Sequence, residues 1–300
     1  MLSSVLALLL GACSQDKQND VKESHGMKIV TSFYPVYSMV KAVSGDLNDV
    51  RMIQSSSGIH SYEPSANDIA AIYDADVFVY HSHTLESWAG SLDPSLQKSK
   101  VKVLEATEGM TLDRVSGLED IEVGEGVDEK SLYDPHTWLD PEKVAEEAQI
   151  IADKLSELDS ENKEIYQSNA KKFIDQAHEL TNKYKPIFDK VEQRTFVTQH
   201  TAFSYLAKRF DLNQLGIAGI SPDQEPSPRQ LTEIQEFVKT YKVKTIFTES
   251  NASSKVAETL IKSTGVSLKT LNPLESDPQN DKSYLDNLEE DIAILAEELK

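Results

Sequence analysis

Two successions of short β-rich runs separated by amphipathic stretches constrain this chain more than any other feature. The β-rich runs lie at residues 28–33, 50–54, 76–81 and 101–105, and again at 195–199, 214–218, 244–249 and 267–272. Stretches with helical spacing of apolar residues lie at 36–43, 66–73, 230–241, 254–264 and 284–299. Strands that alternate with helices form βαβ units with mainly parallel sheets. The chain is therefore expected to be an α/β protein of two (β/α)₄-like lobes.

A long helical stripe lies between the two halves. Its apolar residues are spaced four and three apart: Tyr166, Ala170, Phe173, Ala177, Leu180, Tyr184, Ile187 and Val191. If residues 161–191 are all helical, the helix is about 46 Å long at about 1.5 Å per residue. Ser160 is the expected N-cap, and Pro186 is expected to kink or fray the last turn. We favour a rigid helix that braces the lobes, and an ordinary helical hairpin within one domain is the alternative.

The N-terminal segment predicts a membrane anchor. Residues 2–10 form an apolar run that is too short to cross a bilayer but long enough for a signal-peptide core. Leu10-Gly11-Ala12-Cys13 follows, which is similar to a bacterial lipobox whose leader is cleaved and whose Cys13 is acylated. The alternative is that Cys13 is a buried structural residue. Residues 14–26 are polar and read as a flexible tether.

These patterns divide the chain into four parts. We expect a lipoprotein signal and tether at 1–26, an N-terminal lobe at 27–158, a connecting helix at 159–191 and a C-terminal lobe at 192–300.

Charge and cysteine content exclude several classes of protein. The chain has 30 Lys and Arg against 50 Asp and Glu, a net charge of −20, which argues against a nucleic-acid partner. One cysteine excludes an intrachain disulfide and any multi-cysteine zinc or iron–sulfur site. Residues 113–134 carry eight acids and two bases. A solvated surface loop is the favoured interpretation of this segment, and recruitment of metal by its carboxylates is the alternative.

Four residues of metal-ligand type fall near predicted strand ends, where open α/β sheets bind ligands. They are His60, His136, His200 and Glu275, two from each half. A metal held by all four would lie between the lobes. Three imidazoles and one carboxylate suit zinc, whereas manganese or magnesium would favour more oxygen ligands. Because the four residues are far apart in sequence, their spacing alone is weak support.

Each ligating imidazole should pass its second N–H to a carboxylate, a carbonyl or water. The candidate acids are Glu63, Asp134, Asp140 and Glu249.

Three other histidines and the two tryptophans are expected to have structural roles. His81 and His83 form an H-x-H at the end of a predicted strand, which is either a second metal-binding pair or, as we favour, a pair that lines the cleft or bonds to backbone. His178 is expected to be solvated or to cap a helix. Trp88 and Trp138 are expected near the cleft, with Trp138 shielding a ligand from water.

Several segments resemble one family closely. They are TSFYPVYSMVKAVSGD (31–46), GIHSYEPSANDIAAIYDADVFVYH (58–81), DPHTWLDPEKV (134–144), TQHTAFSYLAKRFDL (198–212), GISPDQEPSPRQL (219–231) and IFTESNASSKVAETLIKSTGVSLKTLNPLE (246–275). The chain resembles the cluster A-I solute-binding lipoproteins of ABC importers, and within them the zinc-specific AdcA/Lmb-like, laminin-binding branch. The resemblance covers most of the chain from about residue 28 onward.

The resemblance implies a fold, a site and a set of partners. The family fold is two (β/α)₄-like lobes joined by one long rigid helix, and its metal ligands map onto His60, His136, His200 and Glu275. The implied function is high-affinity capture of Zn(II) outside the cell and delivery to an ABC permease and its ATPase. The protein would be lipid-anchored on the outer face of a Gram-positive cell membrane. Laminin and other surface zinc-binding proteins are further implied partners. The histidine-rich loop of some zinc relatives is missing, and an acidic stretch stands in its place.

Two alternatives to zinc capture are weighed beside it. One is a manganese-binding member of the same family. The other is a zinc-dependent hydrolase in which Glu275 is the general base, because three histidines with an open position can activate water. The sequence has no HExxH pair, no glycine-rich phosphate loop and no G-x-S-x-G turn. We therefore expect a binding protein and not an enzyme, in which a small shift of the C-terminal lobe opens the site.

Overall fold

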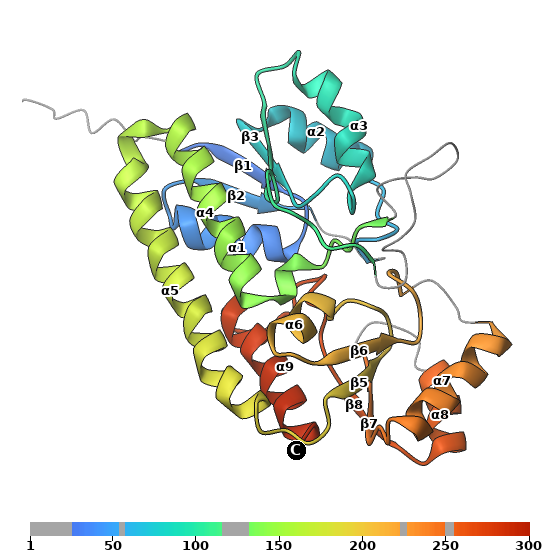
Figure 1. The fold of residues 1–300 in the computed structure, drawn as a ribbon. Helices are drawn as coiled ribbons and strands as arrows, with labels where there is room; N and C mark the ends of the chain where they lie inside the picture. The colour runs from blue at the N-terminus through green and yellow to red at the C-terminus, as the bar shows by residue number, and fades with distance from the viewer. Residues whose placement is uncertain (1–25, 54–57, 116–131, 223–226, 250–254) are drawn as a thin grey trace, which may run out of the picture.

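The computed structural model describes residues 26–53, 58–115, 132–222, 227–249 and 255–300 (Figure 1). Cys13, the rest of the leader and most of the acidic segment predicted at 113–134 lie outside the described residues. In the part that is described, none of the helices combines the length and apolar character that a membrane crossing needs.

The N-terminal lobe contains a parallel four-stranded sheet in the order β2-β1-β3-β4. Its strands are β1 (Lys28–Thr31), β2 (Asp49–Met52), β3 (Val77–Tyr80) and β4 (Lys102–Glu105), and its helices are α1 (Tyr34–Ser44), α2 (Ala66–Asp74) and α3 (Ser87–Leu96). Local sequence sets the helix ends. Ser65 and Asp68 form a reciprocal capping box at the start of α2. Gly45, with φ of 59°, ends α1 in a conformation that favours glycine.

The C-terminal lobe repeats this arrangement with the strand order β6-β5-β7-β8, again all parallel. Its strands are β5 (Thr195–Thr198), β6 (Asn213–Gly216), β7 (Thr245–Thr248) and β8 (Ser267–Thr270), and its helices are α6 (Ser204–Arg209), α7 (Pro228–Thr240), α8 (Lys255–Thr264) and α9 (Tyr284–Glu298). The predicted α/β class with two mainly parallel sheets is confirmed.

A helical pair joins the two sheets. The chain passes from η2 (Thr137–Leu139) into α4 (Pro141–Leu158), through η3 (Ser160–Asn162), and into α5 (Lys163–Phe188). Helix α5 has 26 residues and runs along the side of both lobes, with α4 beside it (Figure 1). The prediction of one long helix between the lobes is confirmed.

The ends of the long helix differ from the prediction. Ser160 is not its N-cap, because the chain first makes the 3₁₀ turn η3 and the helix begins after Asn162. At the other end Pro186 lies in the last turn and the helix ends at Phe188. Ile187 is 36% exposed, and Phe188, four residues after Tyr184, takes the buried position at the end of the stripe.

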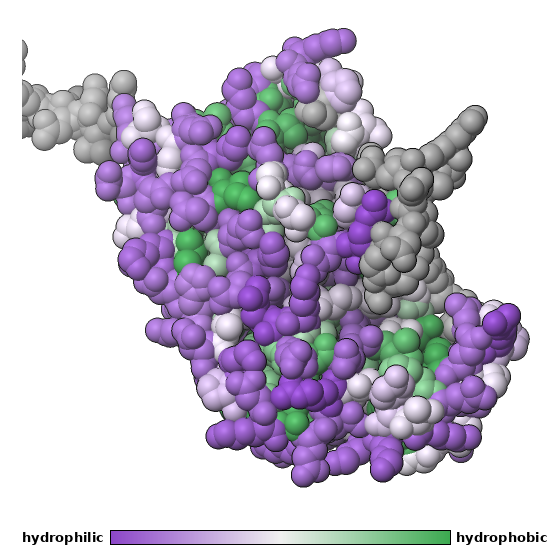
Figure 2. All heavy atoms as spheres, viewed as in Figure 1, coloured by the Kyte–Doolittle hydropathy of each residue, from purple (hydrophilic) through white to green (hydrophobic). Residues whose placement is uncertain are grey.

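The two lobes share one hydrophobic core. A single cluster of buried side chains extends from the N-terminal sheet through α4 and α5 to α9 and to β5. A second, smaller cluster lies in the C-terminal lobe and includes Val197, Ile234 and Leu260. Hydrophilic residues cover most of the face shown in Figure 2. A continuous core between the lobes favours a rigid arrangement over a free hinge.

Candidate metal site

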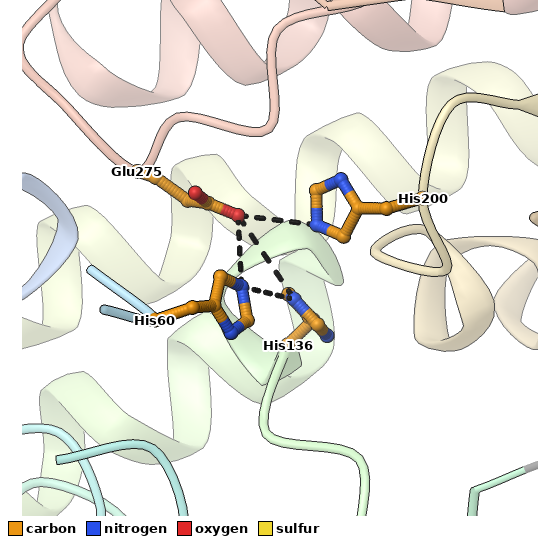
Figure 3. A group of neighbouring side chains, drawn as sticks. All are labelled: His60, His136, His200 and Glu275. Atoms are coloured by element: carbon orange, nitrogen blue, oxygen red, sulfur yellow. Dashed lines mark hydrogen bonds and ion pairs between the residues drawn. The ribbon is translucent and has the colours of Figure 1, made fainter. Parts of the chain in front are cut away.

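His60, His136, His200 and Glu275 point toward one another between the lobes (Figure 3). One ligand atom from each side chain lies within 4.8 Å of the other three. Glu275 Oε1 is 3.2 Å from His60 Nε2, 3.2 Å from His200 Nε2 and 4.0 Å from His136 Nε2. The Nε2 atoms of His60 and His136 are 3.2 Å apart. Tetrahedral zinc with bonds of roughly 2.0–2.1 Å separates its ligand atoms by about 3.3 Å. The three separations of 3.2 Å are close to this value, and the separation between Glu275 and His136 is larger.

Each lobe supplies two of the four side chains. His60 lies in the connection between β2 and α2, and His136 immediately precedes η2. His200 follows β5, and Glu275 lies in the segment after β8. His60, His200 and Glu275 thus follow β2, β5 and β8 at their carboxyl ends, as expected for an open α/β sheet, whereas His136 comes from the segment before η2.

Carboxylates orient two of the three imidazoles. His136 Nδ1 is 2.7 Å from Asp134 Oδ1, and His200 Nδ1 is 2.5 Å from Glu249 Oε1. Since both Nδ1 atoms are engaged, both Nε2 atoms are left to face the centre of the site. The two other predicted partners lie elsewhere. Glu63 is exposed, and Asp140 makes a bidentate ion pair with Arg209.

A close backbone approach positions the turn after His200. A Cβ on Gly216 would come within 2.2 Å of Thr201 Oγ1 and 2.8 Å of the Thr201 nitrogen. Only glycine at this end of β6 lets the turn that carries His200 lie so close to the strand.

Burial and charge shift the pKa values of the site in opposite directions. Burial lowers the pKa of His136 to about 4, and the charges of His60 and His200 add to this against the opposing effect of Asp134. For His200 burial also lowers the pKa, but the carboxylates of Glu249 and Glu275 outweigh it and raise the pKa to about 9. Burial raises the pKa of Glu275, but the nearby imidazoles of His200 and His60 outweigh it and hold the pKa well below its ordinary value.

One buried polar atom at the centre is unsatisfied. His200 Nε2 is shielded from solvent and, among the described residues, has no partner in hydrogen-bonding geometry, although Glu275 Oε1 is near. A buried nitrogen that lacks a hydrogen bond and faces two imidazoles and a carboxylate is the arrangement a cation would satisfy. The unsatisfied His200 nitrogen and the three surrounding side chains therefore fit a zinc ion.

The H-x-H pair does not form a second metal site. β3 ends one residue before His81, so strand alternation does not hold the two rings on one face. The His81 side chain is fully buried, with Nε2 2.9 Å from Thr137 Oγ1. His83 is half exposed and bonds Glu105 through Nδ1 at 2.8 Å. Within the described residues only the four side chains above gather as a possible metal site.

The remaining predicted residues have clear places. Trp138 is fully buried with its ring 5.0 Å from that of His136, and its indole nitrogen donates to the Pro273 carbonyl at 2.8 Å. Trp88 packs instead on Phe78 in the N-terminal lobe. His178, on α5, pairs with Glu142 at the start of α4.

Residues that tie the lobes together were not predicted. The Tyr205 hydroxyl donates to the Asp134 carbonyl at 2.9 Å, and Arg209 holds Asp140. On α9 the Tyr284 hydroxyl donates to the Trp138 carbonyl. These partners lie 69 to 146 positions apart, so local sequence patterns carry no signal for them.

Comparison with known proteins agrees with this geometry. Residues 29–298 match the ZnuA family, described as zinc-uptake complex component A, periplasmic. The chain is 40% identical to the zinc-binding lipoprotein AdcA of Streptococcus pneumoniae, across 100% of this chain and 59% of AdcA. It is 39% identical to the high-affinity zinc uptake system protein ZnuA of Bacillus subtilis, across 97% of this chain and 94% of that protein.

Solved structures match over both lobes. A Zn(II)-bound variant of Streptococcus pneumoniae AdcAII is 82% identical, with a TM-score of 0.87 over 92% of this chain and 99% of that chain. The laminin-binding protein Lmb of Streptococcus agalactiae is 59% identical, with a TM-score of 0.85 over 92% of this chain and 100% of that chain. This chain spans only 59% of the length of AdcA. Taken with the two parallel lobes and the long helix, the match across residues 29–298 shows that the chain belongs to the ZnuA family of zinc-uptake solute-binding proteins.

Proposed function

We propose that this protein captures Zn(II) outside the cell and delivers it to the permease and ATPase of an ABC importer. The observation that carries the proposal is the convergence of His60, His136, His200 and Glu275 at separations that suit a tetrahedral cation. Zinc is cargo here, held by four protein ligands that leave no open position. The zinc-binding names of AdcA and ZnuA support the same cargo.

Metal content and affinity test the proposal. We expect the purified chain to hold one zinc, and His60→Ala, His136→Ala, His200→Ala and Glu275→Ala each to weaken binding by more than about 100-fold. Such a loss would exceed the roughly 10–100-fold loss of metal affinity that follows removal of a residue that only hydrogen-bonds to a ligand. Affinity is the readout, by competition with a chelator, because single-residue variants of AdcAII are themselves described as Zn(II)-bound.

A matched histidine provides the control. His178 is exposed on α5 and pairs with Glu142, away from the four ligands. His178→Ala should bind zinc as the unmodified chain does. Unchanged affinity in the ligand variants would refute the proposed site.

The hydrolase alternative makes a different prediction for Glu275. A hydrolase would keep zinc and lose turnover in Glu275→Ala, whereas a binding protein loses affinity. The short distances from Glu275 Oε1 to His60 and His200 favour a ligand over a general base that acts through an intervening water. We propose that the chain is not an enzyme.

The manganese alternative is tested by the same titration. Three nitrogen donors favour zinc over manganese, which takes more oxygen ligands. Weaker binding of Mn(II) than of Zn(II) by several orders of magnitude is the expected result, and equal affinity would favour manganese transport.

We propose in addition that Cys13 is lipidated and holds the protein on the outer face of a Gram-positive membrane. The support is the Leu-Gly-Ala-Cys motif and the lipoprotein name of AdcA. Mass spectrometry of the mature N-terminus should find an acylated Cys13, and Cys13→Ser should release the protein from the membrane fraction. An unmodified Cys13 in a membrane-free protein would contradict this.

Laminin and other surface zinc-binding proteins are proposed partners on the strength of relatives alone. Lmb is described as bifunctional, with adhesin and metal-transporting activity. Binding of the purified chain to immobilised laminin, measured with zinc and with a chelator, tests the adhesin role.

A further inference from the structure

The backbone immediately before Glu275 is strained. Leu274 has φ of +52°, a left-handed conformation that bulky side chains rarely adopt, and it is 1% exposed. Such a conformation persists only where the surroundings hold it in place.

Two hydrogen bonds hold this segment from within the C-terminal lobe. The Leu274 N–H donates to Asn272 Oδ1 at 3.0 Å, and the Asn272 N–H donates to Asp291 Oδ1 at 2.9 Å. Asp291 lies on α9 and is 3% exposed. Its Oδ2 is buried with no hydrogen-bond partner in the described part of the chain. A buried carboxyl group that accepts only one hydrogen bond, from a single backbone N–H, is uncommon, and its role in the structure needs an explanation.

A third bond reaches the segment from Trp138, which lies in η2. Trp138 Nε1 donates to the carbonyl of Pro273, two residues before Glu275, at 2.8 Å. The Trp138 carbonyl in turn accepts from the hydroxyl of Tyr284. Tyr284 and Asp291 are seven residues apart and therefore share one face of α9. One helix face thus holds both the segment that carries His136 and the segment that carries Glu275.

We propose that Trp138 and Asp291 are positioning residues, which hold the strained Leu274 backbone so that the Glu275 carboxylate is placed at the site before a metal arrives. The inference rests on the proposed function, since it concerns the same zinc site. Holding a ligand in its bound position reduces the ordering cost of binding. His136 and Glu275 would then act as one preformed pair drawn from the two lobes.

Removal of a single N–H tests the role of Trp138. Trp138→Phe keeps a buried ring and loses the bond to Pro273. It should weaken zinc affinity about 3- to 10-fold, the equivalent of one ordinary hydrogen bond. Trp88→Phe is the matched control, because Trp88 is a buried tryptophan whose indole nitrogen has no hydrogen-bond partner among the described residues. Trp88→Phe should leave zinc affinity within about twofold.

A double-mutant cycle separates positioning from general damage. If Trp138 acts through Glu275, then Trp138→Phe should change affinity less than about twofold when Glu275 is already alanine. Equal losses in the two backgrounds would overturn the inference, as would an equal loss in Trp88→Phe.

Asp291 provides a second test that does not depend on the tryptophan. Asp291→Ala removes the acceptor for the Asn272 N–H and should weaken zinc binding about 3- to 10-fold, again only when Glu275 is present. Asp291→Asn keeps an oxygen at the same place and should restore affinity to within about twofold. If Trp138→Phe fails to give a cooperative thermal transition, this pair decides the question. Failure of Asp291→Asn to rescue would overturn the inference.

The outcomes distinguish the two proposals. If the unmodified chain binds no zinc, the proposed function fails and the inference fails with it. If the chain binds zinc tightly and the cycle shows no coupling, only the positioning role is wrong.

Discussion

The carboxylates of Asp134 and Glu249 decide which nitrogen two of the imidazoles present to the site. Each accepts the Nδ1 proton of its histidine, at 2.7 Å and 2.5 Å. The backbone N–H of the same histidine donates to the same carboxylate in both cases. Ring and main chain are therefore fixed together, which leaves Nε2 as the only free donor atom.

Replacement of Glu249 by glutamine should weaken zinc binding. Glu249→Gln keeps the size of the side chain but removes the charge that supports His200, one of the four proposed ligands. We expect about a tenfold loss of zinc affinity, measured by chelator competition. Glu233→Gln, on an exposed α7 position that pairs with Arg229, is the control and should not change affinity. A loss below twofold in Glu249→Gln would contradict this account of His200.

The buried Asp291 makes a prediction about stability and pH. Burial raises the pKa of Asp291 to about 8, well above the ordinary value of about 3.9 for an unfolded chain. Between these values the unfolded state has lost the proton that the folded state keeps, so this group costs increasing stability as pH rises from about 4 to about 8.

Asp291→Asn should therefore raise the free energy of unfolding near pH 8 and leave it nearly unchanged near pH 4. A gain of about 1–3 kcal/mol at pH 8 is expected for the metal-free protein, since each pKa unit corresponds to about 1.4 kcal/mol and relaxation reduces the full effect. Urea unfolding at the two pH values measures it. A gain that is independent of pH would show that the carboxyl does not titrate as described.

Among the elements, the α4–α5 pair depends on small side chains. Ala145, Ala148 and Ala152 are buried on α4, and Ala170 and Ala177 are buried on α5. Alanine at these positions lets neighbouring helices approach closely, and α5 runs along both lobes with α4 beside its upper part (Figure 1).

An enlarged side chain on the buried face of α5 should destabilise the protein. Ala177 is fully buried, so Ala177→Leu should overpack the interface and lower the free energy of unfolding by about 1–3 kcal/mol. Gln176→Leu, on the exposed face of the same helix, should change it by less than about 0.5 kcal/mol. Urea denaturation compares the two, and equal effects would argue against close packing at Ala177.

At the scale of the whole molecule, contacts between the lobes oppose a hinge. Arg209 makes two bonds of 2.9 Å to Asp140, and Tyr205 donates to the Asp134 carbonyl. Zinc release by a shift of the C-terminal lobe would have to break these bonds and the shared core.

Zinc should stabilise the whole chain against unfolding. If both lobes contribute ligands, binding favours the folded state by about 2.7 kcal/mol when free zinc is 100 times its dissociation constant. For a chain of this size that corresponds to a rise in Tm of several degrees, at about 2–4 °C per kcal/mol. Differential scanning calorimetry should find the rise with zinc, its loss with EDTA, and a smaller rise in Glu275→Ala at the same zinc concentration. No shift in the unmodified chain would contradict a site that joins the lobes.

Local patterns in the sequence were sufficient for the elements and the class of fold. Strand and helix periodicity depend on neighbours a few residues apart, so the two parallel sheets and the α5 stripe were predictable. The helix ends were harder to predict, because a 3₁₀ turn precedes α5 and moves the start of this helix away from Ser160. The four candidate ligands were singled out by residue type near predicted strand ends, and resemblance to a family supported them, since their spacing carries no local motif.

Only the tertiary structure decided which side chains meet. It paired Asp134 with His136 and Glu249 with His200. It also paired Asp140 with Arg209 and buried His81 against Thr137. It also placed Trp138 and Asp291 within hydrogen-bonding distance of the backbone before Glu275. Each of these contacts joins residues whose proximity depends on how sheets, helices and lobes pack as a whole. The chain's local chemistry determined what each segment could form, and packing across the two lobes determined which of those segments touch.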